Sequence, residues 1–273
     1  MVAGHPSRHY AGGSMEPLLL SKSRLNTYCQ CPEKFRLTYI EKILVEKTPV
    51  ALIEGSALHH IVENCLVYGK AVPNMAEEAS KEFWSSVQLE ATEYSSAAKL
   101  EAAERKILSE ATRFLEMIGG LNTYQMETYF EHPLVHPATG EVDHSVILRG
   151  YADIIDAPAQ DITRIIDIKT SAKSPHEEQA NRALELTVYA YLMACTFGFQ
   201  ISIPVSFLYL VRTKELKVVW LHSERSMPDF MAAYQEISSI VKAIRHGLFW
   251  KNRGLHCGWC MYQKLCFSPQ HTA

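Results

Sequence analysis

The sequence predicts an α/β protein with a mixed, mostly antiparallel central sheet flanked by helices, an N-terminal helical segment and a cysteine-held C-terminal tail. Apolar residues follow a helical spacing up to Gly119-Gly120, alternate up to about residue 169, and return to helical spacing over residues 175–197. Of the 273 residues, 47% are hydrophobic, which is enough to bury a sizeable core. No internal repeat or low-complexity segment marks a second domain, so we expect one domain over residues 21–273.

The N-terminal part is predicted to be helical after a disordered start. Residues 1–20 open with a Gly-, Ser- and His-rich stretch that has no periodicity, and we expect them to be disordered. Ser21 or Ser23 caps a first helix, and Pro32 suits the first turn of a second. Three more helices are predicted over residues 54–68, 74–94 and 97–117. The last two have charged outer faces and form a helical insertion at about 74–118.

The second half of the chain is predicted to supply the sheet. Residues 124–135, 142–155 and 162–169 alternate as strands and are separated by turns, which predicts an antiparallel meander. A helical stretch, two strands, a helix and the cysteine-rich tail follow, over residues 175–197, 202–211, 216–222, 228–246 and about 250–267.

Composition excludes several classes of protein. A net charge of -3 argues against a nucleic-acid coat, although it allows a local basic groove. No apolar run approaches the ~20 residues that span a bilayer, and the N-terminus lacks the order of a secretion signal, so we expect a cytoplasmic protein without membrane contact. Seven cysteines in that compartment do not form a disulfide framework. Cys65 and Cys195 lie in apolar helical patterns and read as small buried hydrophobes.

The stretch from Arg164 to Thr170 interrupts an apolar strand with an acid and a base. Asp167 and Lys169 are two positions apart and therefore point to the same face. A carboxylate there can hold a divalent cation, and an ammonium beside it can act on a water or a phosphate. The alternative is a structural salt bridge on an edge strand. Asp153 lies on the preceding strand, and we expect an asymmetric loop or bulge to bring it beside Asp167.

Other candidates lie on helices. His59 and Glu63 are four apart and share a helix face. His59 is predicted to reach the acidic residues, with an ordinary helix histidine as the alternative, and Glu63 is interpreted as a surface or supporting carboxylate. Tyr189 is a candidate for the site, with a core aromatic as the alternative.

These motifs, taken in order, resemble a known family. His59 after Gly55, then Gly150-Tyr-Ala-Asp153, then Asp167-Ile-Lys169, then a helix ending in Tyr189, are similar to the PD-(D/E)xK nucleases of the RecB type. The resemblance implies a restriction-endonuclease-like core with Mg²⁺ or Mn²⁺ held by His59, Asp153, Asp167 and the Ile168 carbonyl. It implies that Lys169 is the catalytic lysine. The family's helix motif has Gln four residues before Tyr, whereas this chain has Glu185, which cannot donate a hydrogen bond as an amide does.

The remaining cysteines resemble a narrower branch of that family. Cys31 with Cys257, Cys260 and Cys266 is similar to the iron-sulfur pattern of the AddB nuclease domain and the CRISPR-adaptation exonucleases, which implies a 4Fe-4S cluster. Spacing alone leaves zinc as an alternative. Either metal would tie together the two ends of the chain. Cys29 is interpreted as a bystander, with a swap for Cys31 left open.

The function that follows from the resemblance is metal-dependent cleavage of DNA. We expect an exonuclease that acts on single-stranded DNA or DNA ends in recombination, repair or phage and mobile-element DNA processing, with a helicase or recombination protein as a possible partner. Two alternatives stay open: a non-cleaving DNA-end binding or scaffold subunit with a degenerate site, and a zinc-stabilised interaction protein.

Overall fold

The protein is described by a computed structural model that covers residues 16–44, 47–67, 70–119, 121, 123–159, 162–199 and 201–268. In this part of the chain the helices are α1 (Lys22–Gln30), α2 (Pro32–Phe35), a π-helix (Arg36–Ile40), α3 (Val50–Cys65), α4 (Ala76–Ser85), α5 (Ala97–Ile118), α6 (Gln179–Arg182), α7 (Leu184–Phe197), α8 (Met227–Arg245) and α9 (Gln263–Phe267). Short 3-10 turns span Pro73–Met75, Leu89–Ala91 and Leu255–Trp259.

A six-stranded sheet forms the centre of the molecule. Its strands are β1 (Leu18–Leu20), β4 (Thr123–Val135), β5 (Val142–Ala159), β6 (Ile162–Ser171), β7 (Ile203–Arg212) and β8 (Leu216–Arg225). They are ordered β1-β5-β6-β7-β8, with β4 on the other edge of β5. A separate hairpin pairs β2 (Leu66–Val67) with β3 (Lys70–Ala71). The pairs β1–β5 and β6–β7 are parallel and the others are antiparallel, so the predicted fold class is confirmed.

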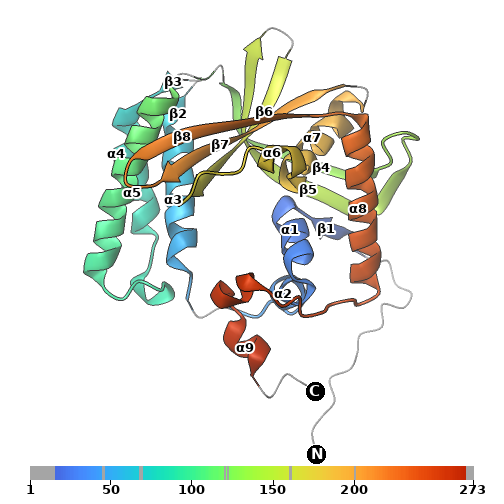
Figure 1. Cartoon of the computed structure of the whole chain (residues 1–273), viewed down its shortest axis with the longest axis horizontal. Helices are drawn as coiled ribbons and strands as arrows, with labels where there is room; N and C mark the ends of the chain where they lie inside the picture. Colours follow the sequence, from blue (N-terminus) through green and yellow to red (C-terminus); the bar gives the residue numbers. More distant parts are fainter. Residues whose placement is uncertain are drawn as a thin grey trace, which may run out of the picture.

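Helices cover both faces of this sheet, which explains the apolar runs in its strands. In β6, Ile165 packs with the core under α7 and α8, whereas Ile166 and Ile168 pack with the core under α3 and α5. Figure 1 shows α3, α4 and α5 grouped at one side of the sheet and α8 at the other. None of the described helices has the length and apolar character that crossing a bilayer requires.

Two predicted boundaries are wrong because of tertiary contacts. Leu18–Leu20, expected to be disordered, form β1 because their backbone pairs in parallel with residues 146–148 of β5. The predictions for residues 1–15 lie outside the described residues. The helix predicted over residues 175–197 is broken at Ala183, whose backbone is extended (ψ 109°). The helix predicted over residues 74–94 is also shorter than expected, since α4 ends at Ser85 and a 3-10 turn follows at Leu89–Ala91. The helix α3 begins at Val50, with Pro49 in the N-cap position, four residues before its predicted start.

Arg225 causes the break between α6 and α7. Its side chain is buried, and its guanidinium donates to Ala180 O at 2.6 Å and to Thr187 Oγ1 at 2.7 Å. These bonds satisfy carbonyl and hydroxyl groups at the joint of the two helices and fix α7 to β8. Because α7 carries Glu185 and Tyr189, Arg225 sets the position of one wall of the candidate site.

We therefore expect Arg225→Met to lower the free energy of unfolding by about 2–4 kcal/mol, because buried acceptors at the α6–α7 joint lose their donor. Urea denaturation followed by circular dichroism measures this change. Lys217→Met, at an exposed position of the same strand, is the control and should shift stability by no more than ~0.5 kcal/mol. Equal effects of the two substitutions would contradict the assigned role of Arg225.

Candidate active site

The acidic residues meet at a fork in the sheet. One edge of β5 pairs first with β1, ending at Leu148, and then with β6, beginning at Ile154. Asp153 lies in β5 between these two ladders. The register Ile154↔Ile166 places Asp153 opposite Asp167, and a register shift between Asp156 and Ala159 produces this alignment. The irregularity predicted from the sequence is therefore confirmed.

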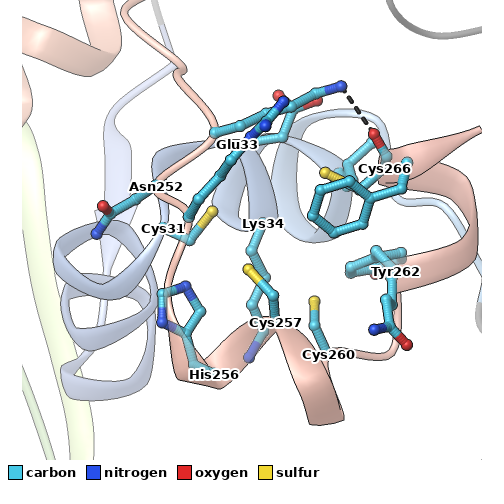
Figure 2. Close-up of a pocket in the computed structure, with 14 residues that line it drawn as sticks. Cys31, Glu33, Lys34, Asn252, His256, Cys257, Cys260, Tyr262 and Cys266 are labelled. Carbon is cyan, nitrogen blue, oxygen red and sulfur yellow. Dashed lines mark hydrogen bonds between the residues drawn. The ribbon is translucent and has the colours of Figure 1, made fainter.

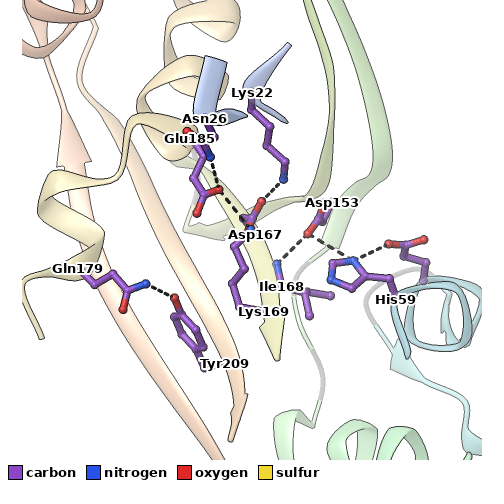
Figure 3. A network of polar contacts seen from close by, with 11 residues as sticks. Lys22, Asn26, His59, Asp153, Asp167, Ile168, Lys169, Gln179, Glu185 and Tyr209 are labelled. Atoms are coloured by element: carbon purple, nitrogen blue, oxygen red, sulfur yellow. Dashed lines mark hydrogen bonds and ion pairs between the residues drawn. The ribbon is translucent and has the colours of Figure 1, made fainter. Parts of the chain in front are cut away.

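At the fork the Asp153 side chain takes the place of a strand partner. Its Oδ2 accepts a hydrogen bond from the backbone N–H of Ile168 at 2.8 Å. Since the N–H and C=O of one strand residue point to the same edge, the Ile168 carbonyl opens toward the same gap as the carboxylate. The predicted main-chain ligand and Asp153 thus lie side by side (Figure 3).

Asp167 is fully buried and is held by two lysines. Lys22 Nζ lies 2.5 Å from Oδ1, and Lys169 Nζ lies 2.5 Å from Oδ2. Burial by itself raises the pKa of a carboxyl, but the two ammonium groups, with Lys169 contributing most, hold the pKa of Asp167 below its ordinary value. Figure 3 shows Lys22 and Lys169 reaching Asp167 from different elements, α1 and β6.

A second cluster lies on the other side of Asp153. His59 Nδ1, on α3, is 3.3 Å from Glu63 Oε1 and 3.7 Å from Asp153 Oδ2. In the described part of the chain, these three residues bring their ligand atoms within 4.8 Å of one another. Glu63, interpreted from the sequence as a surface or supporting carboxylate, is therefore part of the cluster.

Crowding of carboxylates changes the acidity of this cluster. Burial and the charge of Asp167 raise the pKa of Asp153 to about 6. Partial burial and the charges of Glu63 and Asp153 raise the pKa of Glu127, on β4, to about 7. Glu127 also has a left-handed backbone (φ 45°), a strained conformation for a residue without glycine's freedom. A divalent cation would relieve this repulsion, and carboxylate, carbonyl and imidazole donors suit Mg²⁺ or Mn²⁺.

The α7 residues close the site from the side of Asp167. Glu185 Oε2 accepts from Asn26 Nδ2 at 3.1 Å and lies 3.5 Å from Lys169 Nζ. Tyr189 is buried, and Lys22 Nζ lies 4.8 Å from the centre of its ring. Tyr189 also restricts β5, because a Cβ on Gly150 would come within 3.2 Å of Tyr189 Cε1. Glu185 thus lies beside Lys169, whereas Tyr189 packs behind Lys22.

Three residues of the site were not predicted from the sequence: Lys22, Asn26 and Glu127. Lys22 had a signal in the sequence, because a lysine in the first turn of a helix is placed against the helix dipole and needs another reason to be there. Asn26 follows one turn later on the same helix face. Glu127 carried no such signal, since it alternates like any other strand residue.

The predicted cysteines meet far from this site. Cys31, Cys257, Cys260 and Cys266 line one pocket between α2 and the C-terminal tail, and their sulfurs point into a common space in Figure 2. The burial of the Cys266 thiol, together with the nearby Cys31 and Cys260, raises its pKa. Hydrogen bonds from Glu33 N to Trp250 O and from Asn252 Nδ2 to Gln30 O join the two chain ends. Cys29 is exposed and contacts Glu236 instead.

Comparisons with known proteins identify the family of this chain. No curated protein is similar enough to count as a match. A solved structure from Eubacterium rectale, whose name proposes an exonuclease, has a TM-score of 0.54 at 12% identity, covering 97% of this chain and 94% of that chain. The crystal structure of SSO0001 gives a TM-score of 0.45 at 12% identity, covering 94% of this chain and 90% of that chain. The family model of the PD-(D/E)XK nuclease superfamily matches residues 19–267, and the chain therefore belongs to that superfamily.

Proposed function

We propose that the protein is a metal-dependent deoxyribonuclease that acts as an exonuclease on single-stranded DNA or DNA ends. The observation that carries the proposal is the meeting of Asp153, Asp167 and Lys169 at the strand fork, beside the imidazole of His59. We place its work in recombination, repair or the processing of phage and mobile-element DNA, alongside a helicase or recombination protein. A DNA-binding scaffold that does not cleave would have no need for this set of charges.

In the proposed site, His59, Asp153, Asp167 and the Ile168 carbonyl would hold Mg²⁺ or Mn²⁺, with Glu63 as a further carboxylate beside them. The bound cation would supply an acidified water and compensate charge on the phosphate. Lys169 orients the attacking water and balances negative charge as it accumulates on phosphate oxygens. Asp167 holds Lys169 in place through their 2.5 Å ion pair, and Glu185 supports the same ammonium from 3.5 Å.

The cysteine pocket is the second proposed metal site. We propose that Cys31, Cys257, Cys260 and Cys266, which line this one pocket, would hold a 4Fe-4S cluster, with zinc as the alternative. The order of one distant cysteine followed by a C-terminal trio, as in the family branch it resembles, supports the cluster.

Substitutions at Asp167 and Lys169 should separate cation binding from chemistry. Asp167→Asn removes negative charge beside the cation, so it should weaken Mn²⁺ binding and abolish cleavage together. Lys169→Ala removes a like charge, so it should keep or strengthen Mn²⁺ binding while lowering the cleavage rate by roughly 10²- to 10³-fold. Calorimetric titration with Mn²⁺ and single-turnover digestion of end-labelled DNA measure the two effects. Cleavage by Lys169→Ala at the wild-type rate would leave only a structural salt bridge on this strand.

Glu185 stands where the family has glutamine, which gives a second prediction. Glu185→Gln keeps an oxygen that can accept from Asn26 and adds a donor, while it releases Lys169 from one of its two carboxylate neighbours. Single-turnover cleavage should therefore be preserved or faster. The exposed Glu177→Gln is the control. If Glu185→Gln folds but does not cleave, Glu185 is an essential carboxylate and its assignment to the glutamine position is wrong.

The cysteine assignment predicts a coloured protein. Protein purified without oxygen should be brown, with broad absorbance near ~400 nm from thiolate-bound iron. Cys257→Ser should lose the colour and lower the melting temperature because the tail is released from α2, whereas Cys29→Ser should change neither. Colourless protein that contains stoichiometric zinc by elemental analysis would favour the zinc alternative.

A further inference from the structure

Two tyrosines project into solvent beside the candidate cation cluster. Tyr129 on β4 and Tyr151 on β5 are direct cross-strand partners, and 45% and 54% of their surfaces are exposed. Their ring centres are 4.9 Å apart with an interplanar angle of 44°. Both rings are thus largely exposed to solvent.

The strand register places this tyrosine pair next to the acidic cluster along β4 and β5. Tyr151 is two residues before Asp153, and Tyr129 is two residues after Glu127. Two residues span ~6.7 Å at the usual strand rise. Phe130 and Ala152, between them in sequence, pack instead against the core on the opposite face. The tyrosine pair therefore lies directly beside the cation cluster along β4 and β5.

A basic side chain follows the tyrosine pair along the strand. Arg149 precedes Tyr151 by two residues on β5 and lies opposite Glu131 of β4 in the strand register. The Glu131 carboxylate also accepts a hydrogen bond from the Tyr129 hydroxyl. The guanidinium of Arg149 is suited to contact an anion such as a phosphate.

Cross-strand tyrosines also stabilise a sheet, but that role does not require them to lie beside the acidic cluster. A direct aromatic pair contributes roughly 0.2–1 kcal/mol wherever it lies on the pair of strands. Here the exposed rings lie along the strands between a candidate cation site and Arg149. A surface that combines cationic groups with aromatic rings is suited to single-stranded nucleic acid, because unpaired bases stack on the rings and phosphates contact the cations. Bases inside a duplex are already stacked on one another and are not free to bind this way.

We propose that Tyr129 and Tyr151 form a stacking platform for an unpaired base of single-stranded DNA next to the scissile phosphate, with Arg149 contacting a phosphate beyond it. This proposal rests on the proposed nuclease function and narrows its substrate to a single strand or a frayed end. It concerns substrate binding, so it can be tested with the metal withheld.

Equilibrium binding to a fluorescein-labelled oligodeoxythymidylate in EDTA, which prevents cleavage, tests the platform. Tyr151→Leu keeps an apolar side chain on the strand but removes the ring, and it should weaken binding roughly 5- to 100-fold. Tyr151→Phe keeps the ring and should bind like wild type. Phe197→Leu removes an aromatic ring that is also exposed, at the end of α7, and should bind like wild type. Binding of blunt duplex DNA should change little in any of these variants.

Oligonucleotides with one abasic position locate the stacked base. In wild type, one abasic position should cost as much affinity as Tyr151→Leu does, and in Tyr151→Leu the same position should cost nothing more, because the two changes remove one interaction. Arg149→Gln should weaken binding of every sequence and reduce the slope of log affinity against log salt by about 1. Unchanged binding in Tyr151→Leu, or an abasic cost that persists in it, overturns the platform.

Digestion of the same oligonucleotide with Mn²⁺ distinguishes a failure of the nuclease proposal from a failure of the platform proposal. A wild-type protein that binds single strands through the tyrosines but does not cleave overturns the nuclease proposal and leaves the platform standing. If the wild-type protein cleaves, and Tyr151→Leu binds and cleaves equally well, the platform proposal is wrong and the nuclease proposal stands.

Discussion

The burial of the Asp167 carboxylate is the constraint on which the rest of the site depends. A fully buried charge is very costly unless opposite charges meet it, and here two ammonium groups do so, one from β6 and one from α1. Lys169 is two residues away in the chain, so its contact follows from the strand itself. Lys22 belongs to a distant helix, so its contact ties α1 to the sheet. A cation that binds Asp167 directly has to displace or share Lys22.

The sheet topology gives the candidate site two sides that differ in charge. Because β1 and β6 share one edge of β5, Asp153 lies where neither strand completes the ladder. The lysine side is formed by α1 and α7, and the carboxylate and imidazole side by α3 and β4. The ammonium groups of Lys22 and Lys169 thus lie on one side of the two aspartates, and His59 and Glu63 lie on the other side. Such a division suits a reaction in which a cation and an ammonium act on opposite parts of one phosphate.

Local patterns predicted the fold class and the antiparallel meander, because alternation and turn residues determine the facing and order of neighbouring strands. The meeting of Asp153 with Asp167 was expected only with an irregular loop, because it depends on a register shift that alternation does not determine. They could not predict β1, since three leucines after a polar stretch carry no sign of a partner far along the chain. The break at Ala183 was equally hidden, because its cause, Arg225, lies in another strand. Asn26 and Lys22 were missed for the same reason: their roles come from the tertiary placement of α1. The roles of the predicted site residues stay predictions until they are measured.

The pairing of β1 with β5 also affects when the active site forms during synthesis. Leu18–Leu20 leave the ribosome early, but their partner strand and β6 are made much later, and α7 later still. Until then Lys22 has no carboxylate to contact, and Asp153 has no Ile168 amide to accept from. Closing such a long loop is entropically costly and is compensated only when the whole sheet is present. An unfinished chain therefore contains the N-terminal side chains of the candidate site without the site itself.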